Sequence, residues 1–252
     1  MKLLVVGAGE MGRWVADTVD AAVAFTDADA DVAADAAAAR QARRVPTTTD
    51  EAFDVVCLAV PMSAVEAAVD QYAPLANEAI FDVSGVMADP LAAMDAHAPD
   101  LERASFHPLF APPRVPGNVA VVTTEDGPHL QAVREDMAGA GNTVFETTPE
   151  EHDSAMETVQ AGAHTAVLAY ALAAESVREE FATPVSERLE AVATTVTEGD
   201  PGVYAEIQST FDGADAVAEA ARDIAEADDT QFAELYDAAK EHLSVDGRER
   251  HQ

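Results

Sequence analysis

Three glycines near the N-terminus have a spacing that suits the binding of phosphates. Gly7, Gly9 and Gly12 form a Gly-x-Gly-x-x-Gly pattern between an apolar strand pattern and a helical pattern. The first glycine allows a tight turn, the second lets the backbone approach a pyrophosphate, and the third lets the helix pack closely on the sheet. The helix N-terminus then faces the phosphates. We therefore expect this loop, which includes Glu10 and Met11, to bind a dinucleotide.

An acidic residue follows the second predicted strand, Ala22–Thr26. The carboxylate of Asp27 can accept hydrogen bonds from the ribose hydroxyls of adenosine and would repel a 2′-phosphate, so NAD is favoured over NADP. Two nearby acids could fill the same role, and three nearby arginines leave room for NADP. These residues are Asp29, Asp31, Arg40, Arg43 and Arg44. The structural alternative is a Rossmann-like domain that binds another nucleotide, or none.

One histidine is placed to act as an acid or a base. The two lysines, Lys2 and Lys240, lie in the first strand and near the C-terminus, so a histidine or a carboxylate must do this work. His107 ends a predicted strand, and ligands of open α/β sheets bind at the carboxyl ends of strands. The following Pro108 forces the chain to turn there. The alternative is a histidine that merely packs at a strand end.

Polar residues also interrupt an alanine-rich helical pattern in the second half of the chain. At helical spacing Gln160 and His164 nearly share a face, and His152 lies round from them. Gln160 and His164 are candidates to face a cleft between two domains and to bind a substrate there. They could equally be polar groups satisfied at a helix or subunit interface. His152 and Asp153 could be simple polar residues of a first helical turn.

The arrangement of strand and helix patterns predicts the fold. Residues 1–148 alternate short apolar strands with helical stretches, which predicts a Rossmann domain with a doubly wound, mostly parallel sheet. Residues 149–252 read helix after helix, which predicts an all-helical substrate and dimerisation domain. Thr148 suits the N-cap of its first helix. The predicted strands are Leu3–Val6, Val23–Phe25, Val55–Val60, Ala79–Val83, Ala104–Phe106, Val119–Val122 and Thr143–Phe145.

Composition excludes several kinds of partner. The chain carries 47 acidic and 14 basic residues, for a net charge of −33, and this field repels nucleic acid and anionic membranes. No apolar run approaches the ~20 residues of a membrane helix, and the N-terminus has no signal-peptide layout, so we expect a cytoplasmic protein. Dispersed carboxylates with almost no lysine suggest a halophilic cytoplasm, where salt screens the self-repulsion. The single cysteine, Cys57, is expected to be buried, and no cluster predicts a metal site.

Four segments, in this order, resemble a known family. They are the glycine pattern, Phe106–Pro112, the helix from His152 through His164, and Asp200–Gln208. Together they are similar to the prephenate and arogenate dehydrogenases of tyrosine biosynthesis, over roughly residues 5–210. The resemblance implies NAD-dependent oxidative decarboxylation of prephenate or arogenate to 4-hydroxyphenylpyruvate or tyrosine. It further implies that His107 accepts the proton of the ring hydroxyl, that His164 holds the substrate, and that Gln160 supports the cleft.

The sequence departs from the family's pattern at two places. Gly85 stands where the family has a serine, and Ser84 lies one residue earlier. We assign Ser84 to the catalytic site with His107 and leave open whether its hydroxyl reaches that ring. Thr195 stands where the family has an arginine that pairs with a substrate carboxylate. Arg114 is the first candidate to replace this cation, and Arg188 is the second.

The resemblance also implies a homodimer that forms through the helical domain. Two other functions stay open from the sequence. One is a different Rossmann NAD(P)-dependent reductase, and the other is a non-catalytic, nucleotide-binding regulatory protein, which the loss of the arginine would suit. Fold alone does not separate these readings, whereas the site residues do.

Overall fold

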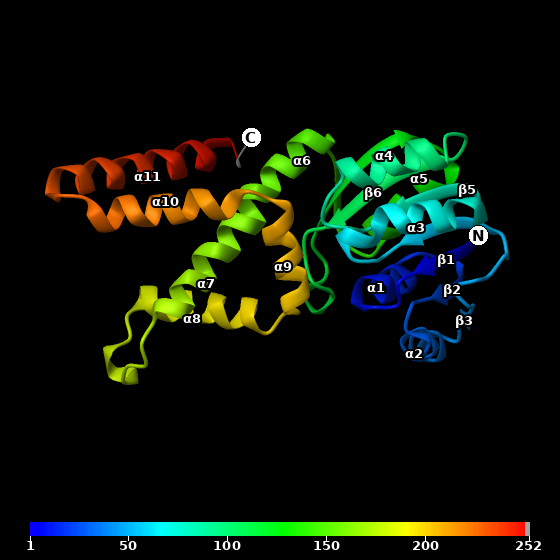
Figure 1. Ribbon diagram of the computed structural model, residues 1–252, viewed down its shortest axis with the longest axis horizontal. Helices are drawn as coiled ribbons and strands as arrows, with labels where there is room; N and C mark the ends of the chain where they lie inside the picture. Colours follow the sequence, from blue (N-terminus) through cyan, green and yellow to red (C-terminus); the bar gives the residue numbers. More distant parts are fainter. Residues whose placement is uncertain (250–252) are drawn as a thin grey trace. The chain divides into compact units, whose positions relative to one another are not determined.

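The computed structural model describes residues 1–249. Contacts within the chain group it into two compact units, Met1–Ala155 and Met156–Gln252, which are described separately (Figure 1). The division falls at the end of helix α6, Pro149–Met156. As predicted, Thr148 caps this helix, because its Oγ1 accepts the N–H of Glu151 at 3.2 Å. The functional boundary at residue 148 stays a prediction.

Eight strands of the first unit form one sheet in the order β3-β2-β1-β4-β5-β6-β7-β8. Every neighbouring pair is parallel except β6 with β7, so the predicted mostly parallel, doubly wound sheet is confirmed. The strands are β1 Lys2–Val6, β2 Ala22–Thr26, β3 Arg43–Arg44, β4 Phe53–Leu58, β5 Ala76–Asp82, β6 Glu102–Pro108, β7 Asn118–Glu125 and β8 Thr143–Glu146.

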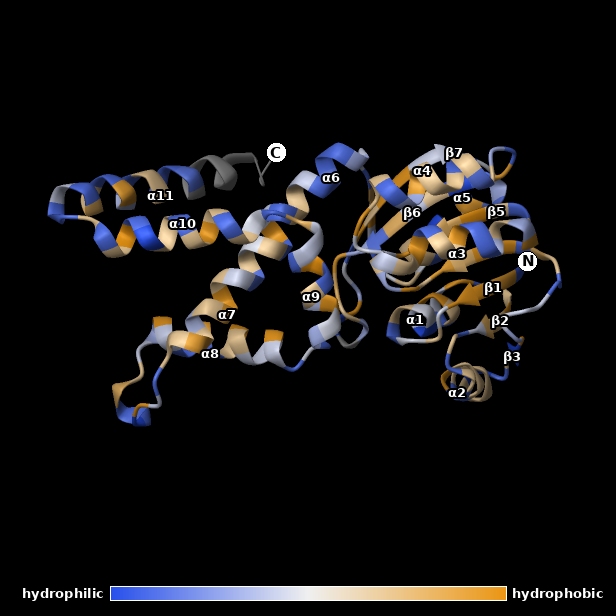
Figure 2. Ribbon diagram, in the orientation of Figure 1, coloured by the Kyte–Doolittle hydropathy of each residue, from blue (hydrophilic) through white to orange (hydrophobic). Residues whose placement is uncertain are grey.

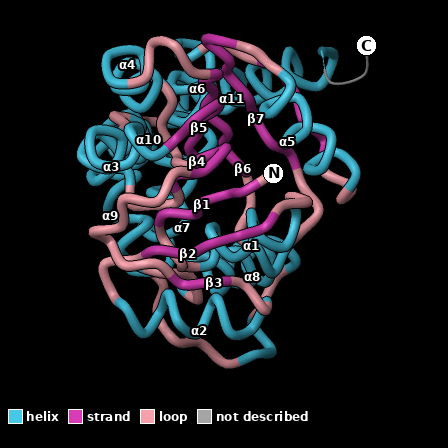
Figure 3. Tube along the Cα trace, turned by 90° about the vertical axis from the view of Figure 1, so that its right-hand side faces the viewer, coloured by secondary structure: helices cyan, strands magenta, loops and turns pink. Residues whose placement is uncertain are grey.

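Helices cover both faces of this sheet (Figure 3). Successive side chains of a strand point to opposite faces, so Leu3 and Val5 enter one buried cluster while Leu4 and Val6 enter another. The first cluster includes residues of α1, α2 and α5, and the second includes residues of α3 and α4. These helices are α1 Glu10–Thr18, α2 Ala30–Arg40, α3 Val65–Tyr72, α4 Ala88–His97 and α5 Pro128–Gly139.

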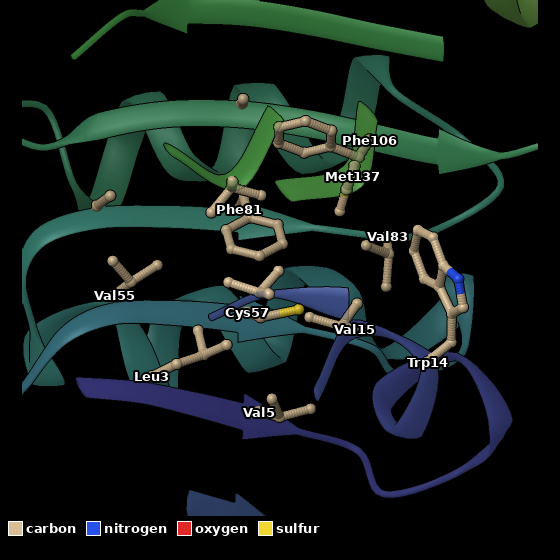
Figure 4. Close-up of a cluster of buried hydrophobic side chains, with 14 of the residues drawn as sticks. Leu3, Val5, Trp14, Val15, Val55, Cys57, Phe81, Val83, Phe106 and Met137 are labelled. Carbon is tan, nitrogen blue, oxygen red and sulfur yellow. The ribbon is translucent and has the colours of Figure 1, made fainter. Parts of the chain in front are cut away.

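The first cluster contains the single thiol of the chain (Figure 4). Cys57 is fully buried beside apolar neighbours that include Phe81 and Phe106, whose rings meet edge to face at 5.3 Å between centroids. Burial raises the pKa of this thiol well above its ordinary value, because a thiolate is poorly solvated there. The predicted role of Cys57 as a buried apolar residue is confirmed.

Two glycines of the N-terminal loop are required by the protein's own backbone. Gly7 has a φ of +94°, and a Cβ there would lie 2.1 Å from the carbonyl oxygen of Ala59. A Cβ on Gly12 would lie 2.0 Å from the carbonyl oxygen of Gly7. The tight turn at Gly7 and the close approach of α1 at Gly12 are therefore as the spacing predicted.

The second unit is helical, and its described residues contain no strand. A π-helical segment, Glu157–Gly162, leads into α7, and a Cβ on Gly213 would lie 1.8 Å from the carbonyl oxygen of Glu157. This glycine therefore lets the start of α10 pack directly against the π-helical segment. Polar and apolar residues alternate along these helices (Figure 2). The helices are α7 Ala163–Ala173, α8 Pro184–Thr197, α9 Pro201–Thr210, α10 Gly213–Glu226 and α11 Asp229–Glu249.

None of the helices in residues 1–249 has the length and apolar character needed to cross a membrane.

Replacement of Gly12 tests the close packing of α1, and replacement of a second glycine controls for the change in helix propensity. Gly12→Ala is expected to lower the free energy of unfolding by roughly 1–3 kcal/mol, because the added methyl group must displace backbone. Gly139→Ala is the matched control, since a Cβ at that position at the end of α5 meets nothing within 4 Å. Denaturant unfolding of both variants provides the measurement. Equal stabilities would contradict this account of α1 packing.

Candidate active site

The carboxyl ends of four parallel strands lie at one edge of the sheet. Register pairs Val6 of β1 with Leu58 of β4, and Leu58 with Asp82 of β5. Asp82 in turn pairs with Ser105 of β6, two residues before His107. The glycine loop, the segment after β5 and the end of β6 therefore share this edge, where α/β sheets bind their ligands.

His107 takes part in a chain of hydrogen-bonded side chains that the sequence did not reveal. Its Nδ1 lies 2.8 Å from Nε2 of His152, and Nδ1 of His152 lies 2.7 Å from Oδ1 of Asp153. The two rings meet edge to face at 5.0 Å between centroids, and only 7% of His107 and 3% of His152 is exposed. His152 and Asp153 therefore do more than fill a first helical turn.

Asp153 is anchored by the start of another helix. The backbone N–H groups of Met87 and Ala88, at the start of α4, donate to its two carboxylate oxygens at 3.2 and 3.3 Å. Burial acts to raise the pKa of Asp153, but the hydrogen bonds from His152, Met87 and Ala88 lower it overall. The carboxyl group is therefore an anion at neutral pH.

The same surroundings keep His107 uncharged. Burial lowers the pKa of His107 to about 3, because an imidazolium loses its hydration there. The neighbouring His152 lowers this pKa further, while Asp153 acts to raise it. A neutral imidazole at neutral pH can accept a proton, which suits His107 to the role of a general base.

The segment after β5 divides its contacts between two residues. The N–H of Ser84 donates to Oδ2 of Asp82 at 2.9 Å, and its hydroxyl contacts the same oxygen and the carbonyl oxygen of Val86. A Cβ on Gly85 would lie 3.8 Å from Nε2 of His107, so this glycine adjoins the ring. The hydroxyl of Ser84 is thus directed to Asp82 and Val86, and its catalytic role stays a prediction.

Asp82 is a buried carboxyl group that sequence reasoning missed. Its side chain is fully buried, and burial raises its pKa to about 6, although hydrogen bonds from Ser84 act to lower it. Asp82 ends an apolar strand pattern, as Asp27 does after β2. The position of an acid at the end of an apolar strand was therefore the available signal.

The side chains of Asp27 and Arg13 hold the backbone of the glycine loop, and the space beside its second glycine is open. Oδ2 of Asp27 accepts the N–H of Ala8 at 2.7 Å, and Nε of Arg13 donates to the carbonyl oxygen of Ala8 at 2.8 Å. Gly9 is the N-cap of α1, without a side-chain cap, and a Cβ there would meet nothing within 4 Å. The first N–H groups of α1 therefore lack side-chain partners and suit an anion.

Neighbours of the loop occupy defined places. Glu10 begins α1 and is exposed, whereas Met11 packs against the first buried cluster. Asp29 accepts the N–H groups of Asp31 and Val32 as the N-cap of α2, so it is committed to that helix. The assignment of Asp27 to a ribose stays a prediction.

In the second unit, α9 supports the helix that bears His164. The rings of His164 and Tyr204 meet edge to face at 4.8 Å between centroids. Gln208 donates to the carbonyl oxygen of Ala161 at 3.0 Å and accepts the hydroxyl of Thr165 at 2.9 Å. The Asp200–Gln208 pattern seen in the sequence therefore provides three contacts to the segment that bears His164.

The remaining predicted substrate-binding residues lie in both units and are described unit by unit. Gln160 lies in the π-helical segment of the second unit, and burial lowers the pKa of His164 there. Arg114 is exposed in the turn Pro112–Arg114 of the first unit, and Arg188 is exposed on α8. Their roles stay predictions. Within residues 1–249, no group of three or more potential ligand side chains is arranged to hold a metal ion.

No protein-family model matches the chain, but individual proteins do. The 4-amino-4-deoxyprephenate dehydrogenase of Streptomyces pristinaespiralis is 33% identical over 190 residues, which cover 67% of this chain and 60% of that protein. The probable arogenate/prephenate dehydrogenase of Methanocaldococcus jannaschii is 25% identical over 170 residues, which cover 62% of this chain and 38% of that protein. The chain therefore matches less than two thirds of the length of either relative.

A solved structure matches the fold over nearly the whole chain. It is the prephenate dehydrogenase of Aquifex aeolicus in complex with hydroxyphenyl propionate and NAD+, with a TM-score of 0.71. The match covers 97% of this chain and 98% of that chain at 15% sequence identity, a level that shows the fold alone. The match therefore includes helices and strands of both units.

The buried carboxyl group of Asp82 should make stability depend on pH. Its folded pKa of about 6 lies above the ordinary value of 3.8, so near pH 5 the folded state holds a proton that the unfolded state has lost. The proton that the folded state retains near pH 5 stabilises it relative to the unfolded state. Raising the pH from about 5 to about 8 removes this stabilisation, which is worth about 1–1.5 kcal/mol. Asp82→Asn lacks it, so its stability relative to the parent should rise by that amount over this range.

Denaturant unfolding at the two pH values tests this dependence. Asp35→Asn, at an exposed position of α2, is the control for the loss of one charge. A constant difference between Asp82→Asn and the parent would contradict the raised pKa.

Proposed function

We propose that this chain is a member of the prephenate/arogenate dehydrogenase family, which its sequence relatives and fold match support, and that it catalyses an NAD-dependent oxidative decarboxylation. The observation that carries the proposal is the neutral, buried His107 at the carboxyl edge of the sheet. Its substrate is prephenate or arogenate, and its product is 4-hydroxyphenylpyruvate or tyrosine.

The glycine loop fits NAD as the cofactor. The open space at Gly9 and the uncapped start of α1 suit a pyrophosphate, with the backbone of Glu10 and Met11 beside it. Each oxygen of Asp27 accepts one backbone N–H, from Ala8 or Asp29, and keeps a lone pair for a ribose hydroxyl. When bound, NAD accepts the hydride that the substrate releases.

Two neighbouring arginines have other partners, which supports NAD over NADP. Arg40 pairs with Asp17, and Arg43 pairs with Glu51 at 2.7 Å. Arg44 makes only a long contact, 3.5 Å, to a backbone carbonyl oxygen. A carboxylate at Asp27 would repel a 2′-phosphate, and these ion pairs leave fewer cations to offset that repulsion.

The chemistry asked of His107 is the transfer of one proton. His107 accepts the proton of the ring hydroxyl as a hydride leaves the carbon that bears it. The ring carboxylate then departs as carbon dioxide, its electrons complete the aromatic ring, and the proton returns to the ring oxygen. Because aromatisation drives the reaction, the protein mainly has to orient the substrate and polarise one hydroxyl. In this proposal Gln160, His164 and Arg114 bind the substrate, and Ser84 assists His107.

A second substrate is favoured by one comparison. The relative with 33% identity is a 4-amino-4-deoxyprephenate dehydrogenase, whose named substrate has an amine in place of the ring hydroxyl. The same histidine could accept a proton from this amine as hydride leaves. A substrate panel should therefore include this compound.

The second unit supports assembly into a homodimer. Large apolar side chains lie exposed on it, most of all Leu172, which is 89% exposed. Such surfaces mark sites of association. Among the residues whose exposure is described, the others above 60% exposed are Val177, Phe181, Val185 and Tyr236. We infer a cytoplasmic homodimer, and the net charge of −33 suits a halophilic cytoplasm.

Turnover is the direct test. The purified protein should form NADH with prephenate, arogenate or 4-amino-4-deoxyprephenate in molar potassium chloride, with less activity in dilute buffer and with NADP. His107→Asn should lower kcat by about 10²–10⁴-fold while NAD+ affinity is unchanged, because only the base is lost. His97→Asn, at the exposed end of α4, is the control.

Two outcomes would contradict the proposal. Full turnover by His107→Asn would show that His107 is not the base of the reaction. Bound NAD+ with no turnover of any of the three substrates would favour another reductase or a regulatory protein.

Replacement of Gly9 tests the cofactor site by itself. Gly9→Ala should fold, because beyond the chain neighbours of Gly9 the added Cβ meets no atom of the described residues within 4 Å. It should bind NAD+ on the order of 10-fold or more weakly, since the methyl group occupies space meant for the pyrophosphate. Calorimetric titration with NAD+ measures the affinity, with Gly139→Ala as the control. Unchanged affinity in Gly9→Ala would place the cofactor elsewhere.

A further inference from the structure

We propose that His152 and Asp153 are positioning residues that fix the proton of His107 on Nδ1 and so present its Nε2 as the base. This inference rests on the proposed function, in which His107 accepts the substrate's proton. It concerns only contacts within the first unit, from the end of β6, the start of α4 and helix α6.

Asp153 lies at one end of the hydrogen-bonded side chains, and its carboxylate can only accept hydrogen bonds. Its oxygens receive the N–H groups of Met87 and Ala88 at the N-terminus of α4, where the helix dipole favours an anion. A third donor, Nδ1 of His152, lies 2.7 Å from Oδ1. Because a carboxylate has no proton to give, that nitrogen of His152 must carry the hydrogen.

The position of this hydrogen decides the tautomer of the second ring. A neutral imidazole has one N–H, so Nε2 of His152 carries a lone pair and accepts a hydrogen bond. The atom 2.8 Å away is Nδ1 of His107, which must therefore be the donor. The remaining nitrogen of His107, Nε2, then carries the lone pair.

That nitrogen lies beside the segment that follows β5. A Cβ on Gly85 would lie 3.8 Å from Nε2 of His107, whereas Nδ1 faces His152. Gly85 follows β5 at the edge that the glycine loop also borders. Nδ1 of His107 therefore contacts His152, and Nε2 lies beside Gly85 at this edge of the sheet.

The same chain offsets the charge that the reaction creates. When Nε2 of His107 accepts a proton, the buried ring becomes a cation. Its Nδ1–H remains donated to His152, and the Nδ1–H of His152 remains donated to Asp153. The carboxylate thus stabilises the cation through two short hydrogen bonds, as a charge-assisted pair does.

Substitutions at Asp153 separate this role from a structural one. In Asp153→Asn an amide nitrogen in the place of Oδ1 donates to His152, and the amide oxygen in the place of Oδ2 accepts from Ala88, while the N–H of Met87 loses its acceptor. Each N–H along the chain reverses, and His107 would carry its proton on Nε2. Asp153→Ala removes the helix cap but imposes no donor on His152.

The two roles predict opposite orders of activity. For the proposed role, kcat should fall on the order of 100-fold or more in Asp153→Asn and less in Asp153→Ala. Stability should follow the reverse order, with Asp153→Ala the lower in melting temperature, because alanine is the poorer cap. If Asp153 is only structural, activity should follow stability, and Asp153→Asn should be the more active variant.

The tautomer itself can be measured without any substrate. In protein labelled with ¹⁵N-histidine at about pH 8, His107 should show a protonated Nδ1 and an unprotonated Nε2. Asp153→Asn should exchange these two resonances, and His107→Asn assigns them. A protonated Nε2 in the parent protein would overturn the inference.

The spectra also separate this inference from the proposed function. If the parent protein turns over none of the three substrates but its spectra show the inferred tautomer, the proposed function fails and the positioning of His107 stands. If turnover is present and Asp153→Asn retains it in full, the proposed function stands and the positioning role fails. NAD+ affinity should be unchanged in both Asp153 variants.

Discussion

Parallel pairing of β1, β4, β5 and β6 is the constraint on which the site in the first unit depends. Parallel strands need crossover helices, and these bury both faces of the sheet, so polar groups can gather only at the strand ends. The glycine loop, Asp82 and His107 all lie at such ends. The antiparallel β7 then pairs with β6, and β8 pairs with β7, so the sheet continues beyond β6.

Burial gives each polar group at this edge its chemical state. His107 and Asp82 are both buried, and burial disfavours the charged form of each, so the pKa of the histidine falls while that of the aspartate rises. Asp153 keeps its charge because three N–H groups converge on it. Similar side chains thus reach different states through the number of hydrogen bonds that each receives.

Close contacts between helices, rather than a sheet, hold the second unit together. The absence of a side chain at Gly213 lets the carbonyl group of Glu157 approach closely. Gln208 joins α9 to the π-helical segment and to α7 through hydrogen bonds with Ala161 and Thr165. Tyr204 then packs its ring against His164. A segment that resembles the dehydrogenases in sequence therefore also has a direct structural purpose, which is to fix the helix that carries a predicted substrate ligand.

The sequence by itself determined the features that depend on local pattern: the alternation of strands and helices, the roles of Gly7 and Gly12, the cap at Thr148 and the strand-end position of His107. Only the tertiary structure decided that His152 joins His107 across 45 positions, that Asp153 receives the start of α4, and that Ser84 turns toward Asp82. Periodicity identifies which face of an element is apolar. It carries no information on which distant donor meets which acceptor, because that pairing is fixed only when the elements pack.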